Sequence, residues 1–134
     1  MRDLTITDPD GVILDSNNAC TRITGYSVEE SRGQTPAMLS SGQHDHEFYR
    51  RMWQSLRRQG YWSGEIWNRR KNGEVYAEML TISSVKDVLG AVQCYVALFS
   101  DITEMKEQQK KLEFIAHYDA LTGLPNRTLF ADRL

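Results

Sequence analysis

The chain has 134 residues, enough for one domain of about 100–120 residues and a short additional segment. The net charge is −2 with both signs spread along the chain, which does not indicate a nucleic-acid partner. No apolar run approaches the roughly 20 residues of a membrane-spanning helix. Cys20 and Cys94 lie far apart in apolar patterns, as is typical of free thiols in a reducing compartment. We therefore expect a cytoplasmic protein without direct membrane contact.

The first elements predicted are two strands joined by a turn. Apolar and polar residues alternate over 4–8, and an apolar run follows at 12–14. Between them stands Pro9-Asp10-Gly11, in which Pro presets φ and Gly accepts a left-handed conformation. Residues 4–15 are therefore expected to form a hairpin.

Helices are predicted next. Asn17 or Asn18 can cap a short helix, and Ser27 with Glu30 three positions later fits a capping box. The clearest helix spans 45–58, where large apolar residues recur every four positions until Gly60.

Three strands are predicted in the second half, at 61–70, 74–85 and 91–99. Lys71-Asn72-Gly73 joins the first two, and Asn-Gly between strand patterns is typical of a hairpin. Both faces of strand 91–99 are largely apolar, so something should cover each face. Helices are expected on one face, and the helix that follows or a second subunit on the other.

The order of strands, a helical block and more strands favours an antiparallel sheet with helices on one face, which is the α+β class. A final helix is predicted over 103–117, a stretch rich in helix-forming residues without Gly or Pro. On a heptad, one stripe of this helix contains Ile102, Met105, Gln109, Leu112, Ala116 and Asp119. Such a stripe favours pairing with a second copy of the chain, while packing on its own domain is the alternative.

Two motifs resemble known families. Asp101-Ile102-Thr103, at the end of a strand and before a charged helix, resembles the exit motif of PAS sensor domains. Gly11 and the turn Thr24-Gly25-Tyr26 add to this similarity, which covers residues 3–103. The sequence DALTGLPNR, from Asp119 to Arg127, resembles the entry motif of GGDEF diguanylate cyclase domains.

The resemblance implies a PAS sensory domain at 1–103, a signalling helix or coiled-coil linker at 104–118, and the truncated start of a GGDEF domain at 119–134. It implies that a homodimer passes a ligand or redox state to cyclic-di-GMP synthesis. A ligand-free PAS dimerisation module is the alternative. The last segment, separated from the rest of its domain, is expected to be mobile or to dock on a neighbour.

This chain lacks the cyclase signature and its metal-binding acidic residues, so we expect no catalysis here, although the full-length protein would be a diguanylate cyclase. Glu65, Glu74 and Glu78 form no nucleophile–base arrangement and are expected to be surface charges. No Cys/His spacing indicates a metal site.

One face of strand 61–70 is a candidate binding surface, because Trp62, Gly64, Ile66 and Asn68 share it by period two. An aromatic ring, a bare backbone position and an amide can form the bed of a planar ligand.

Within PAS domains, three segments resemble the flavin-holding redox and oxygen sensors: Trp53-x-x-Leu56, Trp62-Ser63-Gly64 and Asn68-Arg-Arg-Lys-Asn-Gly73. The resemblance implies FAD as a candidate cofactor, with Asn68 as the first contact and Trp53 as the second; Phe99 completes the candidate set.

Other ligands remain open. The pocket could be empty or hold an unknown small molecule. Haem would need an axial ligand, for which His46 is a better candidate than His44, although the polar surroundings of both favour a solvated helix start. Cysteinyl-flavin chemistry of the LOV kind is not expected, since the equivalent segment, Gly33 to Met38, has no cysteine.

Overall fold

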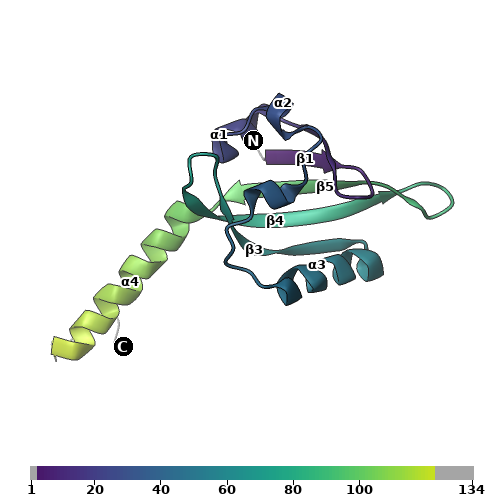
Figure 1. Cartoon of the computed structure of the whole chain (residues 1–134). Coiled ribbons are helices and arrows are strands. Elements are labelled where there is room, and N and C mark those ends of the chain that lie inside the picture. The colour runs from purple at the N-terminus through teal and green to yellow at the C-terminus, as the bar shows by residue number, and fades with distance from the viewer. Residues whose placement is uncertain (1–2, 123–134) are drawn as a thin grey trace. The chain divides into compact units, whose positions relative to one another are not determined.

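The computed structural model describes residues 3–122, which divide into one unit ending at Ile102 and a second beginning at Thr103. The first unit contains a five-stranded sheet in the order β2-β1-β5-β4-β3, and all neighbouring strands are antiparallel (Figure 1). The strands are β1 (Asp3–Thr7), β2 (Ile13–Ser16), β3 (Tyr61–Arg69), β4 (Val75–Lys86) and β5 (Val92–Asp101). The predicted antiparallel sheet and α+β class are confirmed.

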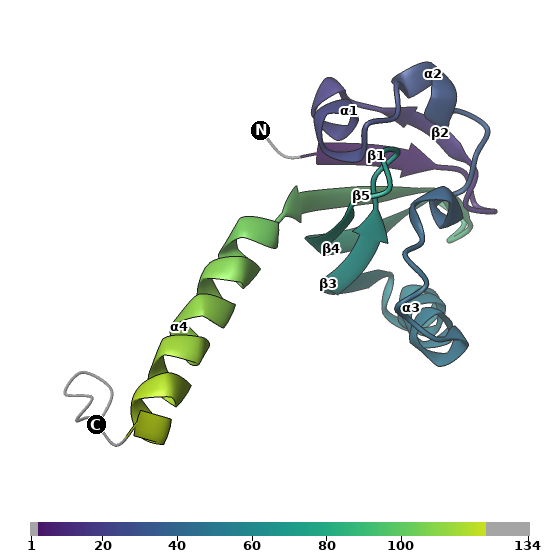
Figure 2. The ribbon, with the colours of Figure 1, turned by 60° about the vertical axis from the view of Figure 1, so that its left-hand side comes forward.

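The helical block lies between β2 and β3 in the sequence, as predicted. It consists of α1 (Asn18–Thr24), α2 (Val28–Ser31), the 3-10 turn η1 (Pro36–Leu39) and α3 (His46–Gln59). The side chain of Asn17 caps α1 and Ser27 forms a capping box with Glu30, so both predicted caps are present. In both ribbon views α3 lies alongside β3 (Figures 1 and 2).

The turn between β1 and β2 is held by the side chain of Asp8. Its Oδ1 accepts hydrogen bonds from the backbone N–H groups of Asp10 and Val12, both at 2.9 Å. Gly11 follows at φ 88°, a left-handed conformation that a residue with a Cβ adopts at a cost. This turn brings Gly11 close to Trp53 of α3. A Cβ at Gly11 would lie 3.9 Å from the Trp53 ring.

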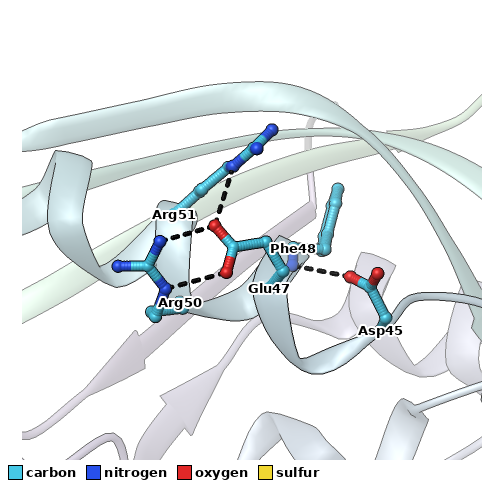
Figure 3. Close-up of polar contacts among 5 residues, drawn as sticks. All are labelled: Asp45, Glu47, Phe48, Arg50 and Arg51. Atoms are coloured by element: carbon cyan, nitrogen blue, oxygen red, sulfur yellow. Dashed lines mark hydrogen bonds and ion pairs between the residues drawn. The ribbon is translucent and has the colours of Figure 1, made fainter.

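The N-terminus of α3 is fixed by side chains of its own first turn (Figure 3). Asp45 accepts a hydrogen bond from the backbone N–H of Phe48 at 2.9 Å and so satisfies one of the free amides of the helix start. Glu47 binds Arg50 and Arg51 along the exposed face. Its hydrogen bonds, chiefly from Arg50, lower the pKa of Glu47 to about 2.

One face of the sheet carries the core. Met52 and Leu56 of α3 pack in a buried cluster with Ile66, Leu80 and Phe99, which come from β3, β4 and β5. These three strand residues share a face. Leu80 lies opposite Phe99 of β5 and opposite Gly64 of β3, and Ile66 follows Gly64 by two positions, so its side chain points to the same side of the sheet.

The opposite face of the sheet is apolar but less covered. Leu4 lies opposite Leu98 and Ile6 opposite Val96, and all four side chains are half-buried. Met79, on the same face of β4, is 41% exposed. The two faces of β5 are therefore both apolar, as the sequence predicts, but unequally buried.

The second unit begins with α4 (Thr103–Thr122), which is longer than the predicted helix. It continues past the expected junction at 118–119, because no Gly or Pro interrupts the sequence before Gly123. Met105 and Leu112 of the predicted stripe are 64% and 68% exposed. The predictions for residues 123–134 concern residues outside the described part of the chain.

Within residues 3–122, no helix has the length and apolar character needed to cross a membrane.

Candidate ligand-binding site

A cavity of about 440 Å³ lies on the core face of the sheet, within the size range of small-molecule sites. All five strands contribute to its wall, together with α3, η1 and the turn after β1, and the wall is mostly apolar. Tyr49, Trp53, Tyr95 and Phe99 contribute aromatic rings to this wall.

The segment after η1 closes the cavity along the edge strand β3. Ser40 forms an antiparallel bridge with Asn68, and the hydroxyl of Ser41 donates to the carbonyl oxygen of Trp67 at 2.7 Å. The backbone N–H of Trp67 donates to Nε2 of His44 at 2.8 Å. These bonds tie the loop to β3 and place Ser40 in the cavity wall.

Four of the six predicted cofactor-binding residues line this cavity: Asn68, Ile66, Trp53 and Phe99. Asn68 is buried, at 8% exposure, and Trp53 packs edge-on against Tyr95 with ring centroids 5.4 Å apart. The fold thus brings these four residues together from three separate elements, β3, α3 and β5.

Trp62 and Gly64 do not belong to the cavity lining. A Cβ at Gly64 would lie 3.0 Å from the ring of Trp62, so the bare backbone makes room for this neighbouring side chain. The Trp62 ring also packs edge-on against Phe48 of α3, at 5.8 Å between centroids. The close approach that we assigned to a ligand is therefore made by Trp62.

Glu78 is a cavity residue that the sequence analysis missed. We expected a surface charge, and this expectation is wrong: Glu78 lines the cavity and is only 3% exposed. The register places it opposite Ile66 of β3. Its parity in β4, shared with Tyr76, Leu80 and Ile82, could have indicated a core-facing position.

The environment of Glu78 favours its protonated form. Burial, with smaller contributions from the carboxylates of Asp101 and Asp3, raises the pKa of Glu78 to about 7. Polar contact with Tyr76 and Asn68 acts in the opposite direction. Among the described residues, no hydrogen-bond partner satisfies Glu78 Oε1 or the hydroxyl of Tyr76.

Arg70 connects Tyr76, which contacts Glu78, with the end of β5. Its guanidinium lies over the Tyr76 ring, 4.2 Å from the centroid, and donates to Asp101 Oδ2 at 2.7 Å. Arg70 also donates to Glu74 at 2.7 Å and to the carbonyl oxygen of Ile23 at 2.6 Å. Asp101 is the last residue of β5, and only Ile102 separates it from α4.

The two described histidine side chains do not line the cavity. Nε2 of His44 accepts the Trp67 N–H, and the ring stacks on Phe48 at 4.1 Å between centroids. Burial lowers the pKa of His44, which favours the neutral ring that accepts this bond. His46 is the first residue of α3 and is exposed. Neither position supports the axial haem ligand considered above.

Comparisons with known proteins agree with this geometry. A sequence model of the PAS domain family matches residues 3–104, and the chain therefore belongs to the PAS domain family. It is 32% identical over 109 residues to a nitrogen fixation regulatory protein of Klebsiella oxytoca, covering 81% of this chain and 22% of that protein. It is 31% identical over 116 residues to the biofilm dispersion protein BdlA of Pseudomonas aeruginosa, covering 86% and 27%. The chain thus spans about a quarter or less of the length of these regulators.

Solved structures show the same fold. The PAS domain of a protein from Colwellia psychrerythraea superposes with a TM-score of 0.72 at 24% identity, covering 77% of this chain and 87% of that one. An RNA-binding light-oxygen-voltage receptor superposes with a TM-score of 0.76 at 25% identity, covering 87% and 34%.

Proposed function

We propose that this PAS domain senses a small ligand or a redox state and regulates an attached GGDEF diguanylate cyclase through the geometry of a homodimer. The observation that carries the proposal is the contact between Tyr76, beside the cavity residue Glu78, and Arg70, which binds Asp101 just before α4. A change at the cavity can therefore reach the start of the helix through three side chains. The attached cyclase itself is inferred from the sequence that begins at Asp119.

The homodimer would use two apolar surfaces. Leu4, Ile6, Val96 and Leu98 form a half-buried patch on the sheet face opposite the cavity. The exposed Met105 and Leu112 provide a stripe on α4. Pairing two copies would remove both surfaces from water, which is favourable at roughly 25 cal/mol for each Å² of apolar area buried.

A flavin fits the chemistry of the cavity wall. Aromatic side chains can pack against a planar ring, and the Asn68 amide can both donate to and accept from its heteroatom edge. Asn68 and Trp53 would hold the ring, and the bound flavin would supply redox chemistry.

The rival function is a PAS module that only dimerises the longer protein, which the apolar sheet patch would also serve. An absorption spectrum of the freshly purified protein, followed by loading with FAD, separates the two functions. Flavin bands that co-elute with the protein are expected. A purely aromatic spectrum after every loading procedure would remove flavin, and failure of any small molecule to occupy the cavity would leave the dimerisation module.

Asn68→Leu tests the proposed flavin contact. Leucine has a similar size but neither donor nor acceptor, and an unpaired ring group costs roughly 1–3 kcal/mol when buried. We expect a folded protein that binds flavin at least about tenfold more weakly, equivalent to about 1.4 kcal/mol, in a fluorescence-quenching titration. Gln59→Leu, at an exposed amide of α3, is the matched control and should bind like the parent. Unchanged flavin affinity of Asn68→Leu would make Asn68 a core residue only.

A further inference from the structure

The charge of the cavity restricts what it can bind. Of the side chains in its wall, only Asp10 and Glu78 carry ionisable carboxyl groups, and the described wall contains no Lys, Arg or His. Asp10 lies in the exposed turn after β1, whereas Glu78 is deep in the core face. Once Glu78 is ionised, an anion in this cavity would meet negative charge without a compensating cation in the described wall, which is unfavourable in a poorly solvated site.

Glu78 also offers a carboxyl group to the cavity. Its Oε1 is buried and has no hydrogen-bond partner among the described residues, and Glu78 is one of the residues that line the apolar cavity. A buried polar atom without a partner is unfavourable, and more so when it is charged. A ligand that donates to the Glu78 carboxyl group would offset this unfavourable burial, so the site favours a donor.

We propose that the cavity binds a compact molecule with a flat apolar body that directs an N–H donor at Glu78, and that it rejects anions of the same shape. The proposal deepens the ligand-sensing function proposed above. A cationic amidine or amine and a neutral ring or amide N–H share this chemistry. The aromatic side chains of the wall suit the flat body of either kind of ligand.

The groups around Glu78 make binding depend on pH. Asn68 and Tyr76 contact its carboxyl group, the carboxylates of Asp101 and Asp3 act on it, and the guanidinium of Arg70 lies beyond Tyr76. Since burial raises the pKa of Glu78 to about 7, the carboxyl loses its proton in the neutral range. A cation pairs best with the ionised form, so its affinity should rise from about pH 6 to about pH 8.

Three probes of one shape test the proposal. Benzamidine carries a cationic pair of N–H donors, benzamide a neutral N–H donor, and benzoate an anionic pair of acceptors. Titrated into the ¹⁵N-labelled protein at about pH 8 and followed by amide chemical shifts, benzamidine or benzamide should bind at least about tenfold more tightly than benzoate. The shifts should lie at the cavity wall, and the two donor probes distinguish a cationic from a neutral ligand.

The variant Glu78→Gln tests whether Glu78 causes the preference for the donor probes over benzoate. It should reduce the preference for the donor probes over benzoate to less than about threefold and remove the pH dependence of benzamidine binding. Glu65→Gln, at an exposed position of β3, is the matched control. It should keep the preference for the donor probes and the pH dependence of benzamidine binding. If the Gln variant does not fold, the rise in benzamidine affinity with pH in the parent is the decisive readout.

Three results would overturn the proposal: benzoate binding as tightly as the donor probes, no binding of either donor probe at millimolar concentration, or an unchanged preference in Glu78→Gln. Donor binding at Glu78 without any effect on cyclase activity of the longer protein would instead contradict the sensory function and leave the ligand class intact.

Discussion

Glu78 is buried because of the register of β4, although the residue type belongs to those that proteins rarely bury. Its position between Tyr76 and Leu80 on the core-facing side of the strand outweighs its preference for water. Burial disfavours the charged carboxylate, and it therefore raises the pKa of Glu78 from an ordinary value of 4.5 to about 7.

This shift predicts a pH-dependent stability. Between about pH 4.5 and pH 7 the folded protein binds a proton at Glu78 that the unfolded chain has released, so stability falls as pH rises through this window. Above about pH 7 the loss of stability is complete, at roughly 3 kcal/mol. Glu78→Gln should therefore gain stability relative to the parent between about pH 5 and about pH 8, measured by urea unfolding. A stability difference that stays constant with pH would contradict the buried ionisation.

Individual site residues were predictable where the alternation of side chains along a strand alone decides which face of the sheet they occupy. Asn68 and Ile66 follow from the period of β3, and both line the cavity. Glu78 was missed because its residue type was weighed more heavily than its parity. The relation between Gly64 and Trp62 was not predictable, because it depends on how one ring folds back over its own strand.

Among the elements, α3 depends most clearly on local side chains. Asp45 is its N-cap, and Arg50 and Arg51 bind Glu47 in the first turns (Figure 3). Because the cap satisfies an otherwise free backbone amide, Asp45→Ala should lower the free energy of unfolding by about 1 kcal/mol. Asp45→Asn keeps an acceptor in the same place and should retain most of the stability.

Urea unfolding of the two Asp45 variants at neutral pH checks this prediction. Equal loss in both variants would show that the charge, rather than the cap hydrogen bond, stabilises the helix start. No loss in either would show that tertiary packing of Met52 and Leu56 alone fixes the start of α3.

Element positions were largely predictable because their causes are local. Caps at Asn17 and Ser27, and the Asn72-Gly73 turn, mark boundaries that the structure shares within a few residues. The strand order was not predictable in the same way, since the pairing of β1 with β5 joins segments from opposite ends of the domain. The cavity depends on this order, and its full lining could therefore not be read from the sequence.

For the whole molecule, the apolar sheet patch predicts self-association. At micromolar concentration, sedimentation should give about twice the chain mass of 15.4 kDa. Leu98→Lys places a charge in the patch opposite Leu4 and should shift the protein to the monomer. Val88→Lys, at a fully exposed turn position, is the control and should remain dimeric. A parent that stays monomeric, also at tenfold higher concentration, would remove the dimer from the account.

We propose that occupancy of the cavity controls the attached cyclase. Ala97 lines the cavity, whereas Ala91 is exposed just before β5, so the same Ala→Phe change fills the cavity at one position and leaves it open at the other. The direct measurement is the rate of cyclic-di-GMP formation by the longer protein that carries the complete GGDEF domain. Ala97→Phe should shift this rate at least about threefold from that of the parent, and Ala91→Phe should leave it unchanged. A folded Ala97→Phe protein that no longer binds ligand but forms cyclic-di-GMP at the parental rate would contradict the account.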